Sequence, residues 1–306
     1  MSGFLDDMAR FSALRVTQAT ARESLAALER RAKSAPPGPP LRLSNAGFDV
    51  IAELKLRSPA AGVLSEQGED WLGRVAQYAL GGAAAVSVLT EPSRFDGSLE
   101  HLRQAALALA PLGVPAMRKD FLVDPYQVLE ARAAGAGGVL VIVRMLSRSQ
   151  MSQLLDAAAE HGMFVLLEAF DAADLATVKD LLTSRCAARV TAGGTTDTAG
   201  RATDTAGRAT DTAGRATEAA ADLLVGINCR DLATLEVVQE RFEALAPQLP
   251  GDWPAVAESG VATAADALRM RRLGYRLALI GTALMGCDEP AKLLGEILAA
   301  TRTLES

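Results

Sequence analysis

The most constraining feature of the sequence is an alternation of short apolar runs with longer amphipathic stretches, which starts near residue 48 and continues to the C-terminus. The short runs are rich in β-branched residues and lack the polar–apolar alternation of a half-exposed strand. Strands of this composition are buried on both faces, as in a parallel sheet between two layers. The sequence therefore predicts eight strands, at residues 50–54, 84–89, 115–117, 139–143, 164–167, 223–227, 255–257 and 277–280.

The intervals between these runs have helical periodicity, with start signals such as Asp124 before Pro125 and with Gly162 where a helix would end. Eight strand–helix units in about 250 residues are typical of an α/β fold, the (β/α)8 or TIM barrel. The alternative, a doubly wound open sheet, usually carries a glycine-rich segment after its first strand, where this chain has Glu53 and Lys55. The predicted helices cover residues 71–80, 99–109, 125–134, 149–161, 172–182, 235–245, 263–273 and 290–303.

Two segments lie outside this alternation. Residues 1–47 form an N-terminal extension, with one helix predicted over 8–31 and a Pro-rich linker after it, so the barrel is expected at 48–306. An insert at about 193–220 contains three copies of Thr-Asp-Thr-Ala-Gly-Arg-Ala, at 196–202, 203–209 and 210–216. We expect these repeats to be a mobile or weakly helical loop on the face of the barrel away from the chemistry, and a partner-binding role is the alternative.

Charge and composition exclude several classes of function. The net charge of −6 disfavours nucleic acid and anionic membranes as partners. No apolar run approaches the ~18 residues of a membrane span, and the N-terminus does not resemble a signal peptide. Three widely spaced cysteines (Cys186, Cys229 and Cys287) indicate reduced thiols and a cytoplasmic location. With histidines only at 101 and 161, both in predicted helices, acid–base chemistry must use Lys, Glu, Asp or Tyr, and no metal site is expected.

Charged and polar residues stand where the predicted strands end, which is where a barrel places its active site. Burying such groups costs several kcal/mol per ion unless they pair or meet a ligand, so their collective placement indicates a site. Arg118, which points the opposite way from its neighbour, is expected to be a solvated loop residue. The expected site groups are Glu53, Lys55, Lys119, Glu168, Asn228, Arg230 and Glu258.

Small residues follow the last two strands, in Glu-Ser-Gly-Val (258–261) and Ile-Gly-Thr-Ala (280–283). Barrels commonly bind phosphate at this position, through backbone N–H groups and a helix N-terminus. Glycine allows the backbone to approach the phosphate oxygens closely. Together, the two segments predict a phosphate site.

Several motifs in consistent order resemble the indole-3-glycerol-phosphate synthase family, from about residue 48 to the C-terminus, and the N-terminal extension is similar too. They are Ile-Ala-Glu-Leu-Lys-Leu-Arg-Ser-Pro (51–59), Ser-Val-Leu-Thr-Glu (87–91), Phe-Asp-Gly-Ser (95–98), Arg-Lys-Asp-Phe (118–121), Asp-Pro-Tyr-Gln-Val (124–128), Gly-Ile-Asn-Cys-Arg-Asp-Leu (226–232), Ala-Glu-Ser-Gly (257–260) and Ile-Gly-Thr-Ala-Leu-Met (280–285). The resemblance implies a lyase of tryptophan biosynthesis. Its reaction closes an indole ring on 1-(2-carboxyphenylamino)-1-deoxyribulose 5-phosphate, with loss of CO₂ and water and without a metal or organic cofactor.

The resemblance also implies catalytic roles. Lys119 would be the general acid of ring closure, and Glu168 the base for dehydration. Independently of the resemblance, partial burial is expected to lower the pKa of Lys119, which suits a proton donor. Lys55, paired with Glu53, would hold the substrate carboxylate. Asn228 would orient the reacting chain, and Glu258 would orient the lysines.

The remaining residues carried over from the family would bind substrate. The phosphate cradle would be Ser58, Ser259, Gly260, Gly281 and Thr282. The walls of the site would be Phe95, Phe121, Leu140, Leu232 and Leu279, with Arg230 in the mouth. Two alternatives are another sugar-phosphate barrel enzyme, such as phosphoribosylanthranilate isomerase, and a non-catalytic paralogue. Non-covalent association with other tryptophan-pathway enzymes stays open.

Overall fold

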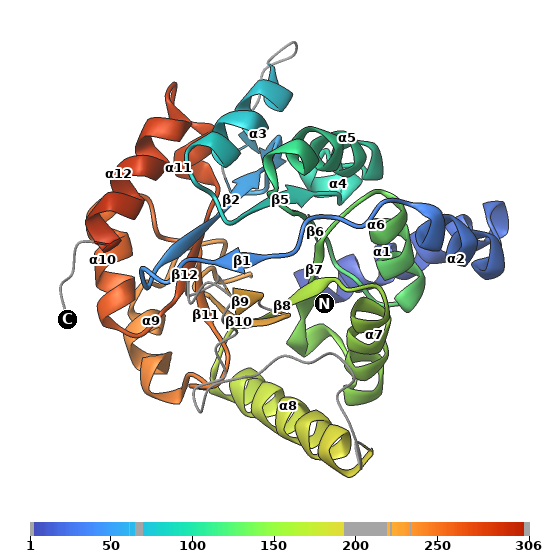
Figure 1. Ribbon diagram of the computed structural model, residues 1–306. Coiled ribbons are helices and arrows are strands. Elements are labelled where there is room, and N and C mark those ends of the chain that lie inside the picture. The colour runs from blue at the N-terminus through green and yellow to red at the C-terminus, as the bar shows by residue number, and fades with distance from the viewer. Residues whose placement is uncertain are drawn as a thin grey trace, which may run out of the picture.

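The computed structural model describes residues 3–60, 62–64, 70–192, 219–220, 222–232 and 234–302. Its centre is a closed barrel of parallel strands, which confirms the predicted fold class. In Figure 1 the strands form a ring with the helices arranged around it. In barrel order the strands are β10 (Leu223–Asn228), β11 (Ala255–Glu258), β12 (Leu277–Ile280), β2 (Asp49–Leu54), β5 (Ala85–Leu89), β6 (Ala116–Lys119), β7 (Gly138–Ile142) and β8 (Phe164–Ala169).

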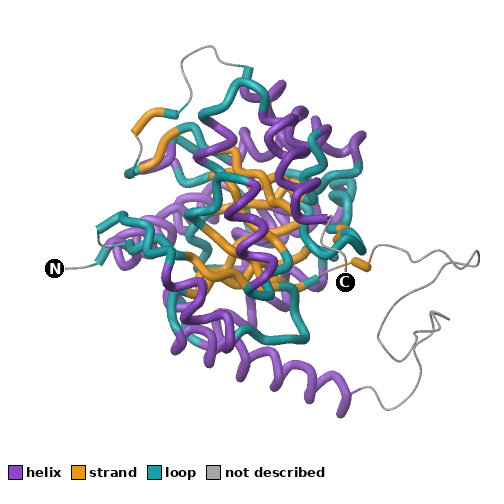
Figure 2. Tube along the Cα trace, turned by 90° about the vertical axis from the view of Figure 1, so that its left-hand side faces the viewer, coloured by secondary structure: helices purple, strands orange, loops and turns teal. Residues whose placement is uncertain are grey.

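Helices cover the outside of the ring, so that Figure 2 shows strands at the centre and helices around them. Local capping fixes where several of them begin: the Asp124 side chain accepts from the Tyr126 N–H at 2.8 Å, and the Ser147 and Gln150 side chains form a capping box. The main helices are α3 (Trp71–Leu80), α5 (Leu99–Leu109), α6 (Pro125–Ala133), α7 (Arg148–Glu160), α8 (Ala172–Ala192), α9 (Glu240–Leu245), α10 (Ala264–Arg272) and α12 (Pro290–Arg302), with short α4 (Pro92–Phe95) and α11 (Thr282–Met285).

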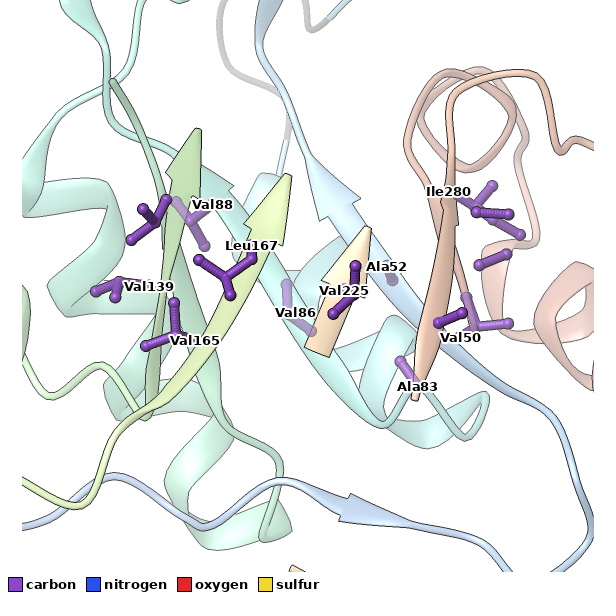
Figure 3. Close-up of a cluster of buried hydrophobic side chains, with 14 of the residues drawn as sticks. Val50, Ala52, Ala83, Val86, Val88, Val139, Val165, Leu167, Val225 and Ile280 are labelled. Carbon is purple, nitrogen blue, oxygen red and sulfur yellow. The ribbon is translucent and has the colours of Figure 1, made fainter. Parts of the chain in front are cut away.

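Alternate residues of each strand face opposite sides of the barrel wall. Outward-facing residues such as Val86, Val165 and Val225 pack with the helices in the larger buried cluster (Figure 3). Inward-facing residues such as Met117 and Leu166 fill the barrel interior. The same alternation directs the odd-numbered side chains of β2 and β6, and the even-numbered ones of β8, β10 and β11, into the barrel.

The N-terminal extension contains two helices where the sequence predicts one. Helix α1 (Phe4–Arg22) ends at Glu23, whose backbone is extended, and Ser24 caps α2 (Leu25–Ser34) by accepting from the Ala27 N–H. The break is held by Tyr126 of α6, whose hydroxyl donates to the Glu23 carbonyl at 2.8 Å. The single-helix prediction was wrong because periodicity alone did not register this capping serine.

The extension reaches both ends of the barrel. Near its start, Phe4 packs edge-on against Phe121, just beyond the C-terminal end of β6. Near its end, β1 (Arg42–Leu43) pairs antiparallel with β9 (Ala219–Ala220), which precedes β10 and so lies at the N-terminal ends of the strands. Leu41 and Leu43 are buried in the cluster that fills the barrel interior. The repeats at 196–216 lie outside the described residues.

Candidate active site

A cavity of about 580 Å³ opens at the C-terminal ends of the barrel strands. Its lining draws on most strand ends, as the sequence predicts for a barrel enzyme. The predicted site residues that line it are Glu53, Lys55, Phe95, Lys119, Phe121, Leu140, Glu168, Asn228, Arg230, Leu232, Glu258, Ser259, Gly260, Leu279, Gly281 and Thr282. Ser58 is not part of this lining; it lies in β3 (Arg57–Ser58), which pairs with β4 (Gly62–Val63).

The ammonium group of Lys119 is the centre of the charged cluster. Its Nζ lies 3.1 Å from Glu168 Oε2, to which it donates a hydrogen bond, and 3.5 Å from Glu258 Oε2. The Lys119 side chain retains only 15% of its exposure, and the two carboxylates 3% and 2%. Three strands, β6, β8 and β11, therefore place one cation between two buried acids.

The pKa of Lys119 is raised, contrary to the prediction that burial would lower it. Burial does act to lower the pKa, but the charges of Glu168, Glu258 and Glu53, with the hydrogen bond to Glu168, outweigh it. Lys119 is thus firmly protonated in the free site. The prediction was wrong because it considered burial without the three carboxylates that the fold brings around the amine.

A second ion pair lies beside the first. Lys55 Nζ is 2.9 Å from Glu53 Oε1, and both side chains are nearly buried, as their shared strand parity predicts. Burial acts to raise the pKa of Glu53, but the charges of Lys55 and Lys119 lower it overall. Lys55 also donates to Thr282 Oγ1 at 3.4 Å, so the pair lies close to the predicted phosphate site.

Glu258 differs from the other acids in its surroundings. Burial and the nearby Glu168 carboxylate raise the pKa of Glu258 well above its usual range, against the opposing charge of Lys119. Among the described residues, no N–H or O–H group donates a hydrogen bond to either carboxyl oxygen, although the neighbouring Glu168 carboxylate lies close enough to share a proton with this group. A buried acid without such partners has spare capacity to bind a polar ligand or hold a proton.

Asn228 links the end of β10 to the loop after β11. Its side-chain oxygen accepts from the Arg230 N–H at 2.9 Å and from Ser259 Oγ at 3.0 Å. Ser259 and Gly260 both have positive φ, 66° and 85°, so this loop is sharply turned where it borders the cavity. The residues predicted to orient substrate and to bind phosphate are therefore held in one network.

Aromatic rings form the opposite wall. The ring centroids of Phe95 and Phe121 lie 6.1 Å apart, and Phe4 of α1 lies 5.8 Å from Phe121. Sequence reasoning missed Phe4, because nothing in the local pattern of the extension indicates that it reaches the cavity. Its hydrophobic position at the start of α1 was the available signal.

The loop after β10 is also part of the lining. The predicted helix over 235–245 begins only at Glu240, because Leu235 has a left-handed backbone (φ 63°) and its carbonyl accepts from the Arg230 guanidinium at 2.8 Å. Val237, which forms a β-bridge with Arg230, and Gln239 line the cavity as a result. Both were missed because an amphipathic pattern was read as helix.

Behind Lys119 lies a buried ion cluster that the sequence did not predict. Arg118 is 2% exposed and donates to Asp120 Oδ2 at 3.0 Å, so its interpretation as a solvated loop residue was wrong. Arg15 of α1 binds both Asp120 oxygens, at 2.8 and 2.6 Å. Burial acts to raise the pKa of Asp120, but the two arginines hold it below its usual range. The outward-pointing arginine is thus an anchor between α1, β6 and α6, where it also pairs with Glu130.

Within the described ranges, no group of three or more His, Cys, Asp and Glu side chains is arranged to hold a metal ion. In the same ranges, no helix has both the length and the apolar character that crossing a bilayer requires.

Comparison with known structures shows the fold. The 3-hexulose-6-phosphate synthase from Salmonella typhimurium aligns over 83% of this chain and 98% of its own, with a TM-score of 0.54 at 13% identity. A thiamine phosphate pyrophosphorylase from Pyrococcus furiosus aligns over 84% of this chain and 96% of its own, with a TM-score of 0.52 at 12% identity.

Comparison of sequences is more specific. The family model for indole-3-glycerol phosphate synthase matches residues 5–185 and 208–297. The indole-3-glycerol phosphate synthase of Leifsonia xyli is 38% identical over 95% of this chain and 94% of its own length, and that of Mycolicibacterium smegmatis is 35% identical over 90% and 87%. These matches do not favour the isomerase or the paralogue alternative. The chain belongs to the indole-3-glycerol phosphate synthase family.

Proposed function

We propose that the cavity closes an indole ring on 1-(2-carboxyphenylamino)-1-deoxyribulose 5-phosphate, with loss of CO₂ and water. The observation that carries this proposal is the position of Lys119, a protonated amine held between two carboxyl groups in a cavity that has an aromatic wall. The lining offers Phe95 and Phe121 to an aromatic ring, and Lys55 and Arg230 to anionic groups of a substrate.

Ring closure needs a proton donor at the ketone oxygen, because attack by the aromatic carbon turns that oxygen into an alkoxide. Lys119 is the proposed donor. An alkoxide is a far stronger base than an amine, so an ammonium group with a raised pKa still delivers its proton as the negative charge develops. Phe95 and Phe121 would hold the aromatic ring against the ketone carbon, a near-attack arrangement.

Loss of CO₂ follows from the product of ring closure itself. The cationic iminium formed there accepts the electron pair of the breaking carbon–carboxylate bond, so the protein needs only to hold the carboxylate. Lys55 is the proposed partner of that carboxylate, and its ion pair with Glu53 fixes its position.

Dehydration needs a base for a carbon-bound proton and an acid for the departing hydroxyl group. Glu168 is the proposed base, because its carboxylate lies inside the cavity and accepts a hydrogen bond from Lys119. Lys55 and Glu53 lie on the neighbouring part of the rim and are proposed to share the proton transfer to the leaving oxygen.

The phosphate is proposed to bind between the loops after β11 and β12, at Ser259, Gly260, Gly281 and Thr282. Gly281 immediately precedes α11, and Thr282, the first residue of that helix, accepts from the Lys55 ammonium group at 3.4 Å. Ser58, which the sequence assigned to this cradle, is left out of it because it does not line the cavity.

The test is direct conversion. Purified protein mixed with the carboxyphenylamino-deoxyribulose phosphate should develop indole fluorescence and release one CO₂ per product. The rate should be unchanged by a metal chelator. Protein that folds, binds the substrate and gives no indole product would overturn the proposal.

We also propose a cytoplasmic site of action, in line with the free thiols of Cys229 and Cys287. Association with other enzymes of the tryptophan pathway is a further proposal, which co-purification of the tagged chain from its own cells would test.

A further inference from the structure

A glycine in the middle of β10 interrupts the inner wall of the barrel. Gly226 lies between two inward-facing residues of the same strand, Leu224 in the packed interior and Asn228 at the cavity. Its Cα is paired with Glu168 on one side and with Val256 on the other. The wall therefore has a gap directly beside one of the two acids that hold Lys119.

The carboxyl group of Glu258 fills this gap. A β carbon built on Gly226 would lie 2.0 Å from Glu258 Oε1 and 3.1 Å from its Cδ, and 3.0 Å from a methyl carbon of Leu166. The first distance is far below any non-bonded contact, and the Leu166 methyl limits movement on the other side. Any side chain at position 226 would thus displace the Glu258 carboxyl group.

The position of the Glu258 carboxyl group allows its contact with Lys119. From there, its Oε2 lies 3.5 Å from Lys119 Nζ. The charged groups that face it are Lys119 from β6, Glu168 from β8 and Glu53 from β2. A carboxyl group pushed out of the gap would lose this position beside the amine.

The same relationship occurs once more in this site. A β carbon on Gly281 would lie 2.4 Å from Glu53 Oε1. In both cases a glycine on one strand, or directly after it, leaves room for a carboxyl group that comes from a neighbouring strand. Two of the three acids around Lys119, Glu258 and Glu53, therefore occupy space that is open because a neighbouring residue is glycine.

We propose that Gly226 is a positioning residue for the ring-closing reaction, because its lack of a side chain gives the Glu258 carboxyl group its place beside Lys119. This inference rests on the proposed function for its kinetic consequences and on geometry alone for its structural one.

The decisive variant is Gly226→Ala. We expect kcat to fall by about 10²-fold, as for a catalytic group that is misplaced by about 1 Å, with a smaller change in KM. The pH profile of the free energy of unfolding should also change, because a Glu258 carboxyl group that is better exposed to water has a pKa closer to its usual value. A crystal structure of the variant should show the Glu258 carboxyl group beyond ion-pair distance from Lys119 Nζ.

Gly138→Ala is the matched control. It also adds a methyl group to the inner wall of a strand, where its β carbon would lie 2.4 Å from the Phe164 ring, at the other end of the barrel from the site. We expect a lower melting temperature without a shift of the pH profile. A purely structural role for Gly226 would make the two variants behave alike and would overturn the inference.

A double variant tests the link between the two residues. If Gly226 acts through Glu258, then Gly226→Ala adds little to the loss already caused by Glu258→Gln, whereas independent effects multiply. Fully multiplicative losses would overturn the inference, as would an unmoved Glu258 in the crystal structure. Wild-type protein that forms no indole would instead overturn the proposed function, and the structure of Gly226→Ala would still decide the role of Gly226.

Discussion

Lys119 donates a hydrogen bond of 3.1 Å to Glu168 across the mouth of the barrel, although 49 positions separate the two residues in the sequence. With Glu258 on its other side, the amine is a positive charge shared by two buried acids from different strands. The stability and the activity of the protein are therefore coupled at this point, because each group is tolerated in the interior only through the others.

Replacing Lys119 with alanine should slow ring closure strongly and destabilise the fold. We expect kcat to fall by about 10²- to 10⁴-fold, the usual contribution of an acid–base group. Removal of the amine leaves buried carboxylates without their cation, so the melting temperature should fall at pH 8 and recover toward pH 5 as they take up protons. Indole fluorescence and thermal melts across this range are the measurements. A variant as active as wild type would exclude Lys119 as the acid.

Replacing Glu258 with glutamine should stabilise the protein while slowing it. The pKa of Glu258 is higher in the folded chain than its usual value of 4.5, so the folded state loses stability as pH rises through that pKa. Glutamine does not titrate, so the variant should gain on wild type with increasing pH, by at most about 1.4 kcal/mol per pH unit between the unfolded and the folded pKa of Glu258. Urea unfolding at several pH values would measure the difference. A constant difference would contradict it.

Glu53→Gln should change the free energy of unfolding in the opposite direction from Glu258→Gln. The pKa of Glu53 is lowered in the folded state, mainly by Lys55 and Lys119 against the effect of burial, so its ionised form stabilises the fold above pH 4.5. The glutamine variant should be less stable than wild type at pH 7, because Lys55 loses its partner, and the deficit should shrink in acid. The same unfolding series measures it. Parallel behaviour of the two glutamine variants would refute the assignment.

Asp120→Asn should loosen α1 from the barrel. The carboxylate joins Arg15 of α1 to Arg118 of β6, and breaking a buried pair of this kind costs about 3–5 kcal/mol. We expect lower stability and faster proteolysis within residues 4–22. Arg10→Ala is the control on the same helix, since that arginine is 67% exposed and pairs only locally with Asp7. Equal effects from the two variants would show that the cluster does not anchor the helix.

Deleting residues 196–216 should leave the rate within a few-fold of wild type. The chain on either side belongs to α8 and to β9, and β9 precedes the start of β10, at the end of the barrel away from the cavity. Indole formation by the shortened protein is the measurement. A large loss of rate with an unchanged melting temperature would indicate that the repeats act on the site.

Much of the architecture is predictable from the sequence because periodicity and barrel geometry are local rules applied repeatedly. The apolar runs indicate the strands, and strand parity alone places Glu53 and Lys55 on one face and brings them to a 2.9 Å ion pair. The same rule places Lys119 inside and Arg118 outside. The surroundings of Arg118 were predicted wrongly, because strand parity gives the direction of a side chain but does not identify the residues that it contacts.

The rest depends on contacts between segments far apart in the chain. The sign of the pKa shift of Lys119 depends on acids from three other strands. The contact of Phe4 with Phe121 joins the extension to the loop after β6, and no local pattern predicts it. Likewise, the left-handed turn at Leu235, which holds Arg230, interrupts a stretch whose amphipathic pattern resembles a helix.

The N-terminal extension has a consequence for any shortened form of this enzyme. Its first turn supplies an aromatic wall to the cavity, and its last residues close the far end of the barrel at Leu41 and Leu43. A chain beginning at residue 48 would keep every ionisable group of the catalytic cluster, yet it would lose the Phe4 ring at the cavity and the leucines at the opposite end of the barrel. Such a fragment would therefore retain the charged residues of the site, but water would enter the barrel interior from both ends.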